Sequence, residues 1–268
     1  MRKQIIFEDI SDLDLTETLL CGQCFRWRKM ADGSFEGIVR GRCVRVFLDG
    51  SSLTIDGDDD RALWKEYFDL SLDYRAVKDR LSETHPVMRD AMRYAPGIRI
   101  LSQEPFEALI TFIISQNNNI KRIEGIVLRL CENFGKEIAD GVYAFPTAER
   151  LASLSIDDLA PIRAGFRHKY IIDAAEKINS GEIDPDMLRT MPYEEARQKL
   201  MTIKGVGEKV ADCALLYGLH RLDAFPGDVW MKRAMKELFD DMDPALFGEY
   251  AGIAQQYIFH YARTRYFK

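Results

Sequence analysis

Hydrophobic and polar residues alternate along the first part of the chain as they do in β-strands, and this pattern ends near residue 57. The Asp32-Gly33 and Asp49-Gly50 pairs favour hairpin turns between such strands. The predicted strands are residues 24–30, 34–40, 43–48 and 52–55. We therefore expect a small antiparallel sheet at the N-terminal end.

From residue 58 onward the apolar residues follow the spacing of helices. The first two predicted helical faces consist of Ala62, Leu63, Tyr67 and Phe68, and of Tyr74, Val77, Lys78 and Leu81. Beyond the prolines at positions 86, 96 and 105 the pattern predicts helices and no further strand. The expected fold class is α+β, with an antiparallel sheet layered with helices over residues 1–95 and an all-α domain over residues 96–268.

The composition of the chain is that of an ordinary soluble protein, with 268 residues of which 47% are hydrophobic and 30% charged. The most apolar stretch, residues 108–114, is shorter than the roughly 20 residues that a membrane-spanning helix needs. The N-terminal residues lack the long apolar region of a secretory signal. Five scattered cysteines, an odd number, favour reduced thiols in an intracellular compartment.

The net charge of −6 counts against a protein that binds nucleic acid over a wide surface, because such proteins are usually basic. The charge is unevenly distributed, however. Residues 56–60 form an acidic cluster expected in a solvated turn, whereas residues 161–170 contain Arg163, Arg167 and Lys169 and no acid. This distribution is compatible with a small basic contact surface and a shallow dependence of binding on salt.

The sequence Lys204-Gly205-Val206-Gly207-Glu208-Lys209 is the most informative motif of the chain. Two glycines one residue apart permit a tight turn, and converging N–H groups at the start of a helix bind anions such as phosphate. Lys209 is then expected in the first turn of that helix, and Asp228 follows a Pro-Gly turn further along. A phosphate grip, an amine and a carboxylate together indicate chemistry on the backbone or sugar of a nucleic acid.

Each part of this motif also has a purely structural interpretation. A single G-x-G turn often only connects two helices. Asp228 is a good N-cap for the helix that follows it, and Lys209 could be a solvated surface lysine. Lys204 is a second candidate amine, but it precedes the hairpin and is expected near phosphate or solvent. The combination, and no single member, favours a functional site.

Residues 200–213 together with Pro226-Gly227-Asp228 resemble the helix-hairpin-helix and Gly/Pro-Asp loop of a superfamily of DNA glycosylases. The hairpin unit is expected over about residues 193–218 and the loop over about residues 224–230. Three further segments narrow the resemblance to 8-oxoguanine DNA glycosylases: Cys21-Gly22-Gln23-Cys24-Phe25-Arg26-Trp27, Ser115-Gln116-Asn117-Asn118-Asn119-Ile120-Lys121-Arg122 and Gly165-Phe166-Arg167-His168-Lys169-Tyr170. The matching segments run from about residue 20 to about residue 260.

The resemblance implies a bifunctional glycosylase and AP lyase that removes 8-oxoguanine opposite cytosine from duplex DNA. Lys209 would attack C1′ of the sugar and form an imine, after which β-elimination breaks the strand, while Asp228 stabilises positive charge on the sugar. A helix N-terminus and desolvation both disfavour the ammonium form of such a lysine. The implied protein is a cytoplasmic monomer, acting at the prokaryotic nucleoid and needing no cofactor.

For the flipped base, the resemblance implies that the backbone carbonyl of Gly22 accepts the N7 proton that 8-oxoguanine carries and guanine lacks. Leaving that carbonyl unpaired costs about 1–3 kcal/mol, which discriminates roughly 10- to 100-fold against guanine. Cys213 and Phe259 would enclose the base, and Gln255 would bind its Watson–Crick edge. Without the resemblance, packing in the core is the commoner interpretation of Cys213 and Phe259, and a simple turn explains Gly22 equally well.

For the opposite strand, the resemblance implies that Asn117 enters the vacated space beside the orphaned cytosine. Arg122 and Arg167 would donate hydrogen bonds to that cytosine, and Phe166 would act as a wedge in the kinked duplex. Related proteins often have tyrosine at the wedge position. Taken alone, the run of asparagines at 117–119 indicates only a helix end or cap.

At the hairpin, the resemblance implies a phosphate grip by Gly205, Val206 and Gly207. A monovalent or calcium ion held by the carbonyls of Ile203 and Val206 could assist that grip, although no metal is required for the reaction. The chain departs from the family pattern at Trp230, where histidine is common, so the role of this residue stays open.

Three alternative functions remain. A sister glycosylase of the same fold would act on another damaged base, and a non-catalytic helix-hairpin-helix protein would need the hairpin but not both Lys209 and Asp228. The spacing of Cys21 and Cys24 also fits a redox or zinc protein. A zinc site needs four ligands, however, and neither a second cysteine pair nor paired histidines follow.

Overall fold

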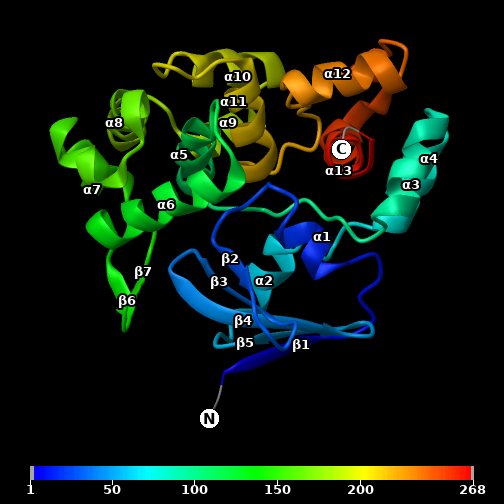
Figure 1. The fold of residues 1–268 in the computed structure, drawn as a ribbon, viewed down its shortest axis with the longest axis horizontal. Coiled ribbons are helices and arrows are strands. Elements are labelled where there is room, and N and C mark those ends of the chain that lie inside the picture. The colour runs from blue at the N-terminus through cyan, green and yellow to red at the C-terminus, as the bar shows by residue number, and fades with distance from the viewer. Residues whose placement is uncertain (1–2, 267–268) are drawn as a thin grey trace.

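A five-stranded antiparallel sheet lies at one side of the molecule, and a larger assembly of helices covers it (Figure 1). The computed structural model describes residues 3–266. The strands are β1 (Gln4–Phe7), β2 (Trp27–Lys29), β3 (Phe35–Val39), β4 (Arg42–Asp49) and β5 (Ser52–Asp56), in the order β1-β5-β4-β3-β2. The α+β fold and the four strands predicted from the alternating pattern are confirmed.

The sheet buries one face against two helices, α1 (Leu15–Leu19) and α2 (Arg61–Tyr67). The largest side chains of this first core include Trp64 and Phe68, which are fully buried. The predicted buried face of α2 was wrong in two residues, because Ala62 is exposed and Trp64, which was not included, is buried. In addition, neither β1 nor α1 was predicted. Both missed elements are very short, so their existence depends on packing against the rest of the sheet more than on local pattern.

The helical part contains most of the remaining chain. Its helices are α3 (Tyr74–Ser82), α4 (Pro86–Tyr94), α5 (Pro105–Ser115), α6 (Ile120–Phe134), α7 (Ala148–Ala152), α8 (His168–Asn179), α9 (Pro185–Thr190), α10 (Tyr193–Met201), α11 (Glu208–Cys213), α12 (Val229–Leu238) and α13 (Ala251–Tyr261). Shorter helical turns η1 (Asp157–Ile162), η2 (Gly165–Arg167), η3 (Ala214–Gly218), η4 (Pro244–Tyr250) and η5 (Ala262–Tyr266) connect or extend them.

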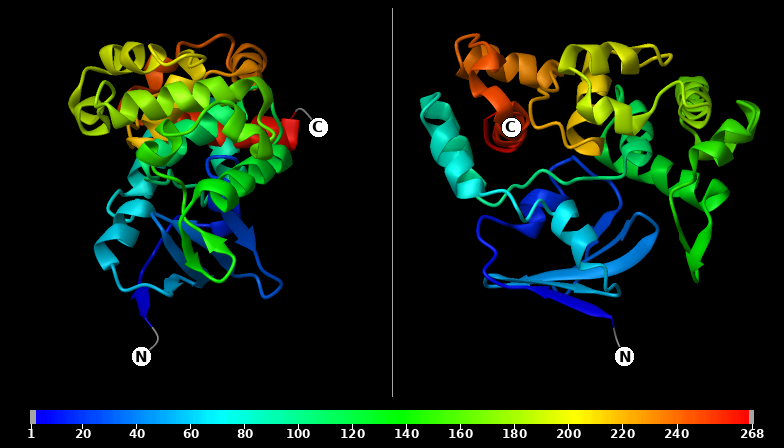
Figure 2. Two further views of the ribbon diagram at one scale, coloured as in Figure 1. Left: turned by 90° about the vertical axis from the view of Figure 1, so that its left-hand side faces the viewer. Right: turned by 180° about the vertical axis from the view of Figure 1, so that it is seen from behind.

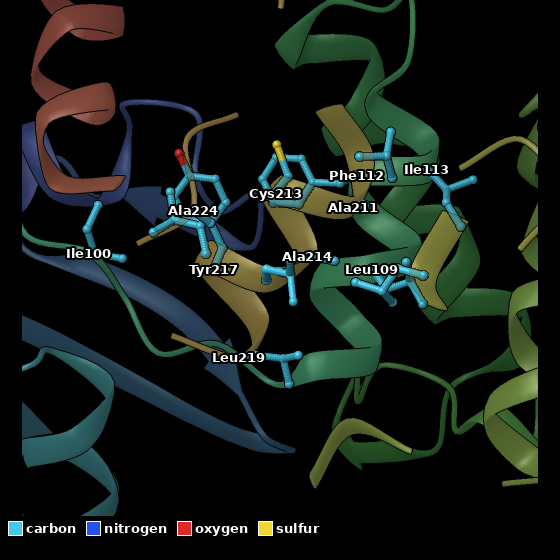
Figure 3. Close-up of a cluster of buried hydrophobic side chains, with 14 of the residues drawn as sticks. Ile100, Leu109, Phe112, Ile113, Ala211, Cys213, Ala214, Tyr217, Leu219 and Ala224 are labelled. Carbon is cyan, nitrogen blue, oxygen red and sulfur yellow. The ribbon is translucent and has the colours of Figure 1, made fainter. Parts of the chain in front are cut away.

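Helix α5 lies at the centre of the helical part, and most of its side chains are buried. It packs against α11 and η3, where Phe112 stacks on Tyr217 with ring centroids 5.1 Å apart. Figure 3 shows Cys213 and Ala214 in the same cluster, between the two segments. This apolar contact fixes α11 relative to α5, and with it the start of α11.

Helices α3 and α4 lie at one flank of the molecule beside α13, as the further views of Figure 2 show. Their buried residues Tyr74 and Met88 belong to the same core as α13 and not to the core of the sheet. Along the chain, the buried residues change from the core of the sheet to the helical core between Phe68 and Tyr74, and Leu101 alone returns to the core of the sheet. A domain boundary after residue 95 stays a prediction.

A small hairpin of two strands, β6 (Glu137–Ala139) and β7 (Val142–Tyr143), projects at the opposite flank (Figures 1 and 2). The prediction of helices alone beyond the prolines was wrong at this point, because two-residue and three-residue strands leave almost no alternating pattern. Within residues 3–266, no helix is long and apolar enough to cross a bilayer.

The run of asparagines lies between α5 and α6, as the structural interpretation predicted. The side chain of Asn119 caps α6 by accepting a hydrogen bond from the Arg122 amide at 3.0 Å. Asn117 has a left-handed backbone, with φ of 45°, and is exposed. The chain therefore turns sharply after α5 and presents Asn117 to solvent.

Candidate active site

A cavity of about 280 Å³ opens among α5, α6, α11, α13 and the loop that follows α1. Its lining residues are Gly22, Phe25, Phe112, Ser115, Asn118, Asn119, Ile120, Ile123, Lys209, Asp228, Trp230, Phe259 and Arg263. Four of the predicted site residues, Gly22, Lys209, Asp228 and Phe259, are thus brought together from distant parts of the sequence.

Lys209 lies in the first turn of α11, as predicted. Its amine hydrogen-bonds the Ser115 hydroxyl, with Nζ 3.4 Å from Oγ, and lies 5.1 Å from the ring centroid of Phe112. The side chain is only partly exposed. The amine is therefore held at the cavity wall by a hydroxyl and an aromatic ring, and is not extended into solvent.

Asp228 is the N-cap of α12, as its structural interpretation predicted. Its Oδ1 accepts a hydrogen bond from the Met231 amide at 2.8 Å. The same side chain lines the cavity that Lys209 lines. Capping fixes the orientation of the carboxylate, so the structural and the functional interpretations of Asp228 are compatible.

Gly22 has a φ of 99°, a conformation that residues with a side chain rarely adopt. A Cβ at this position would lie 3.9 Å from the ring of Phe259, so the loop backbone runs close to that ring. Phe259 is partly exposed on α13 and lines the cavity. The two predicted base-recognition residues therefore face the same space.

Cys213 and Gln255 are buried, and neither lines the cavity surface. Burial raises the pKa of the Cys213 thiol to about 11, although the neighbouring Lys209 amine acts in the opposite direction. The Tyr217 hydroxyl lies 2.5 Å from the side-chain oxygen of Gln256 and 3.3 Å from that of Gln255, so its single proton is directed to Gln256. Both Cys213 and Gln255 lie behind the wall of the cavity in this structure.

The predicted hairpin connects α10 to α11. Gly205 has a φ of 76°, and a Cβ there would lie 2.4 Å from the ring of Tyr170, so only glycine fits. Gly207 is extended and no side chain caps α11, whereas the Val206 amide already donates to the Ile203 carbonyl at 3.0 Å. Lys204 pairs with Asp173, its Nζ 3.0 Å from Oδ1, and does not line the cavity.

Of the four residues predicted to contact the opposite strand, Asn117, Arg122 and Phe166 are exposed at the surface. Phe166 is 55% exposed, and its ring lies 4.3 Å from the guanidinium of Arg167. Arg167 itself is buried and donates hydrogen bonds to the carbonyls of Gln116, Asn117 and Ala164. Burial lowers the pKa of the Arg167 guanidinium, and the nearby charge of Arg122 lowers it further. Arg167 thus ties the Phe166 segment to the turn that carries Asn117.

Several residues of the cavity were missed by sequence reasoning. Ser115, the first residue of the asparagine segment quoted above, and Phe112, three residues before it on α5, hold the Lys209 amine, and neither had been assigned a role. Arg263 follows Phe259 by one helical turn, and that spacing was the available signal. Trp230 lines the cavity at the position where the resemblance offered no role.

Cys21 and Cys24, whose spacing fits a redox motif, are both buried and free. Burial raises the pKa of the Cys21 thiol to about 11 and that of Cys24 well above its ordinary value. Burial therefore disfavours the thiolate form that redox exchange and zinc binding require.

Two family models together match most of the chain. Residues 5–109 match the model of the 8-oxoguanine DNA glycosylase N-terminal domain, and residues 110–243 match that of the HhH-GPD superfamily of base excision DNA repair proteins. The chain belongs to the 8-oxoguanine DNA glycosylase family. The glycosylase is 34% identical to the N-glycosylase/DNA lyase of Saccharomyces cerevisiae, over 84% of this chain and 68% of that protein.

Solved structures support the same assignment. The glycosylase is 42% identical to MBOgg1, solved in complex with a low-affinity DNA ligand, with a TM-score of 0.92 over 97% of this chain and 96% of that one. It is 35% identical to the 8-oxoguanine glycosylase/lyase of Clostridium acetobutylicum, solved with duplex DNA containing cytosine opposite 8-oxoguanine, with a TM-score of 0.90 over 98% and 97% of the two chains. The glycosylase is thus a DNA-repair enzyme with N-glycosylase and AP lyase activities.

Proposed function

We propose that this glycosylase excises 8-oxoguanine paired with cytosine and then cleaves the strand 3′ to the abasic site through an imine on Lys209. The observation that carries the proposal is the shared cavity, in which Lys209 and Asp228 lie with Gly22 and Phe259. An amine, a carboxylate, an aromatic ring and a closely approaching backbone are the groups that sugar attack and base recognition need.

In the proposed reaction, the Lys209 nitrogen attacks C1′ as the bond from C1′ to N9 of the base breaks. The bonding electrons leave with the base, and positive charge develops on the sugar, where the fixed carboxylate of Asp228 stabilises it. Loss of a proton from nitrogen and opening of the sugar ring give the imine. Because the imine makes the C2′ hydrogens acidic, the 3′ phosphate leaves by β-elimination.

Recognition of the base rests on Gly22 and Phe259 in this proposal. The Gly22 carbonyl accepts the N7 proton of 8-oxoguanine, and Phe259 stacks on one face of the base. Cys213 forms the other face and Gln255 binds the Watson–Crick edge. Since both of these are buried behind the cavity wall, they would contact the base only after the wall rearranges as the base enters.

Contact with the opposite strand would come from Asn117, Phe166 and Arg122, all of which are exposed. Arg167 would reach the orphaned cytosine only by giving up backbone carbonyls to which it donates here. In this proposal its first role is to hold Asn117 and Phe166 in register. The wedge and the filler would then enter the duplex together.

The hairpin would bind a phosphate through the Gly205 and Gly207 segment and the first turn of α11. That turn has no capping side chain, so its N–H groups can serve an anion. The Val206 amide is already paired internally and contributes less. A monovalent or calcium ion at the carbonyls of Ile203 and Val206 would add to this grip. The glycosylase would act as a monomer on chromosomal DNA in the cytoplasm.

Borohydride trapping tests the proposed function. Wild type, Lys209→Gln and the matched control Lys204→Gln are incubated with a duplex that carries one 8-oxoguanine opposite cytosine. Wild type and Lys204→Gln should form a covalent adduct that Lys209→Gln cannot form, and undamaged duplex should give none. An adduct with Lys209→Gln, or with a duplex carrying another damaged base but not with 8-oxoguanine, would contradict the proposal.

A further inference from the structure

Two cationic side chains line the cavity, those of Lys209 and Arg263. Arg263 lies in η5, the π-helical segment that directly continues α13. Because it follows Phe259 by four residues, it shares a helix face with that ring, and its guanidinium carbon lies 5.9 Å from the ring centroid. Its Nη1 lies 3.6 Å from the position that a Cβ on Gly22 would occupy. The guanidinium thus stands between the Gly22 loop and Phe259.

The Arg263 guanidinium contacts a ring but, within residues 3–266, is not engaged by a carboxylate or a carbonyl. This differs from Arg167, whose N–H groups are committed to backbone carbonyls. Burial lowers the pKa of His260, and the positive charge of Arg263 lowers that pKa further. An exposed cation at the rim of the cavity, whose donors contact no acceptor among residues 3–266, is suited to an acceptor that arrives with the substrate.

The position of Arg263 favours the base over the sugar as that acceptor. Lys209 and Asp228 are the groups that would act on the sugar, whereas Arg263 lies beside Gly22 and Phe259, the groups that would contact the base. In 8-oxoguanine the N7 proton is flanked by two carbonyl oxygens, O6 and O8. A donor adjacent to the Gly22 backbone therefore faces one of these oxygens when the Gly22 carbonyl accepts the N7 proton.

We propose that Arg263 is a further catalytic residue, which donates a hydrogen bond to a carbonyl oxygen of the flipped 8-oxoguanine and stabilises the negative charge that the base acquires on leaving. This inference rests on the proposed function of the cavity. When the bond from C1′ to N9 breaks, its electron pair moves onto the base and is shared by O6 and O8. The Lys209 nitrogen supplies the electron pair of the new bond to C1′ and releases a proton, which the base takes up.

A guanidinium binds an anionic oxygen more strongly than a neutral carbonyl, so the contact strengthens as the base leaves. An interaction that is stronger in the transition state than in the ground state accelerates the reaction. The later β-elimination starts from a sugar that no longer carries the base. Arg263 should therefore affect base excision and leave cleavage of a preformed abasic site unchanged.

The variant Arg263→Met tests this inference, because methionine keeps an apolar stem over Phe259 and removes every donor. Arg265→Met is the matched control, since Arg265 is exposed in the same segment and does not line the cavity. Single-turnover excision of 8-oxoguanine by Arg263→Met should fall about 10- to 100-fold, the range for loss of a hydrogen bond to a charged group. Strand cleavage at a preformed abasic site and excision by Arg265→Met should equal those of wild type.

Three results would overturn the role of Arg263. Normal excision by Arg263→Met would exclude contact with the leaving base. Weaker duplex binding with a log–log salt slope reduced by about 1 would identify a phosphate contact instead. An equal loss of abasic-site cleavage would indicate an effect on Lys209 or on folding, which a lower melting temperature would reveal. By contrast, failure of the wild type itself to excise 8-oxoguanine would contradict the proposed function.

Discussion

Asp228 caps α12 and, in the proposed function, stabilises charge on the sugar, and two substitutions separate these two roles. Asparagine caps helices as well as aspartate does, whereas alanine does not cap. The cap here is a hydrogen bond of 2.8 Å from the Met231 amide to Oδ1. Asp228→Asn should therefore keep the free energy of unfolding within a few tenths of a kcal/mol of wild type.

Asp228→Ala should lose about 1 kcal/mol of stability, because the amide of Met231 loses its partner. For a chain of this size, that loss lowers the melting temperature by about 2–4 °C. The rate of base excision should not follow stability, because it should fall equally in the two variants. Both variants lack the carboxylate, and loss of one fixed group that stabilises transition-state charge costs about 100- to 1,000-fold in rate.

The assay is single-turnover excision from a duplex with one 8-oxoguanine opposite cytosine, run beside thermal unfolding of each variant. We expect Asp228→Asn to be as stable as wild type and about as inactive as Asp228→Ala. Wild-type excision by Asp228→Asn, with a defect in Asp228→Ala that follows its lower stability, would show that Asp228 is a helix cap and nothing more.

Gly207→Ala should fold normally, because the backbone at residue 207 is extended and a Cβ there would meet nothing within 4 Å. The variant should bind the duplex about 10-fold more weakly when affinity is measured by fluorescence anisotropy. Unchanged affinity would argue against a phosphate contact at the hairpin. Burial raises the pKa of the Glu107 carboxyl from 4.5 to about 7, so between these pH values the folded chain holds a proton that the unfolded chain has released, and the free energy of unfolding falls as pH rises. Urea unfolding of Glu107→Gln should show a flatter pH dependence in that window, and equal slopes would be evidence against the raised pKa of Glu107. Iodoacetamide should label Cys43 in the folded protein and spare Cys21 and Cys24, since only Cys43 of the three is exposed; mass spectrometry showing early labelling of Cys21 would revive the redox alternative.

The features that sequence predicted well are those fixed within a few residues. The position of Lys209 in the first turn of α11 follows from the glycine hairpin before it. The capping role of Asp228 follows from its place after Pro-Gly and before a helical pattern. Gly205 and Gly22 both have left-handed backbones, as tight turns require. Local chemistry is enough to predict such features.

The features that were missed depend on contacts between distant segments. Strand β1 exists because it pairs with β5, and α3 and α4 join the helical core because α4 packs beside α13 and α3 packs on α4 and η4. The hydrogen bond from Arg167 to the Gln116 carbonyl links segments far apart in the chain, and no local pattern around Arg167 predicts it. The four-residue spacing of Arg263 from Phe259 was a weak local signal. That Arg263 lines the cavity depends also on the approach of the Gly22 loop, which the spacing does not predict.

We propose Lys209 as the nucleophile, and locating the covalent bond tests this assignment. The borohydride-reduced complex of wild type with the 8-oxoguanine duplex is digested with nuclease and protease, and the peptide that carries the sugar remnant is sequenced by mass spectrometry. We expect a single modified residue, Lys209, in the peptide that begins α11. A remnant on Lys204, or on the N-terminal amine, would refute Lys209 as the nucleophile.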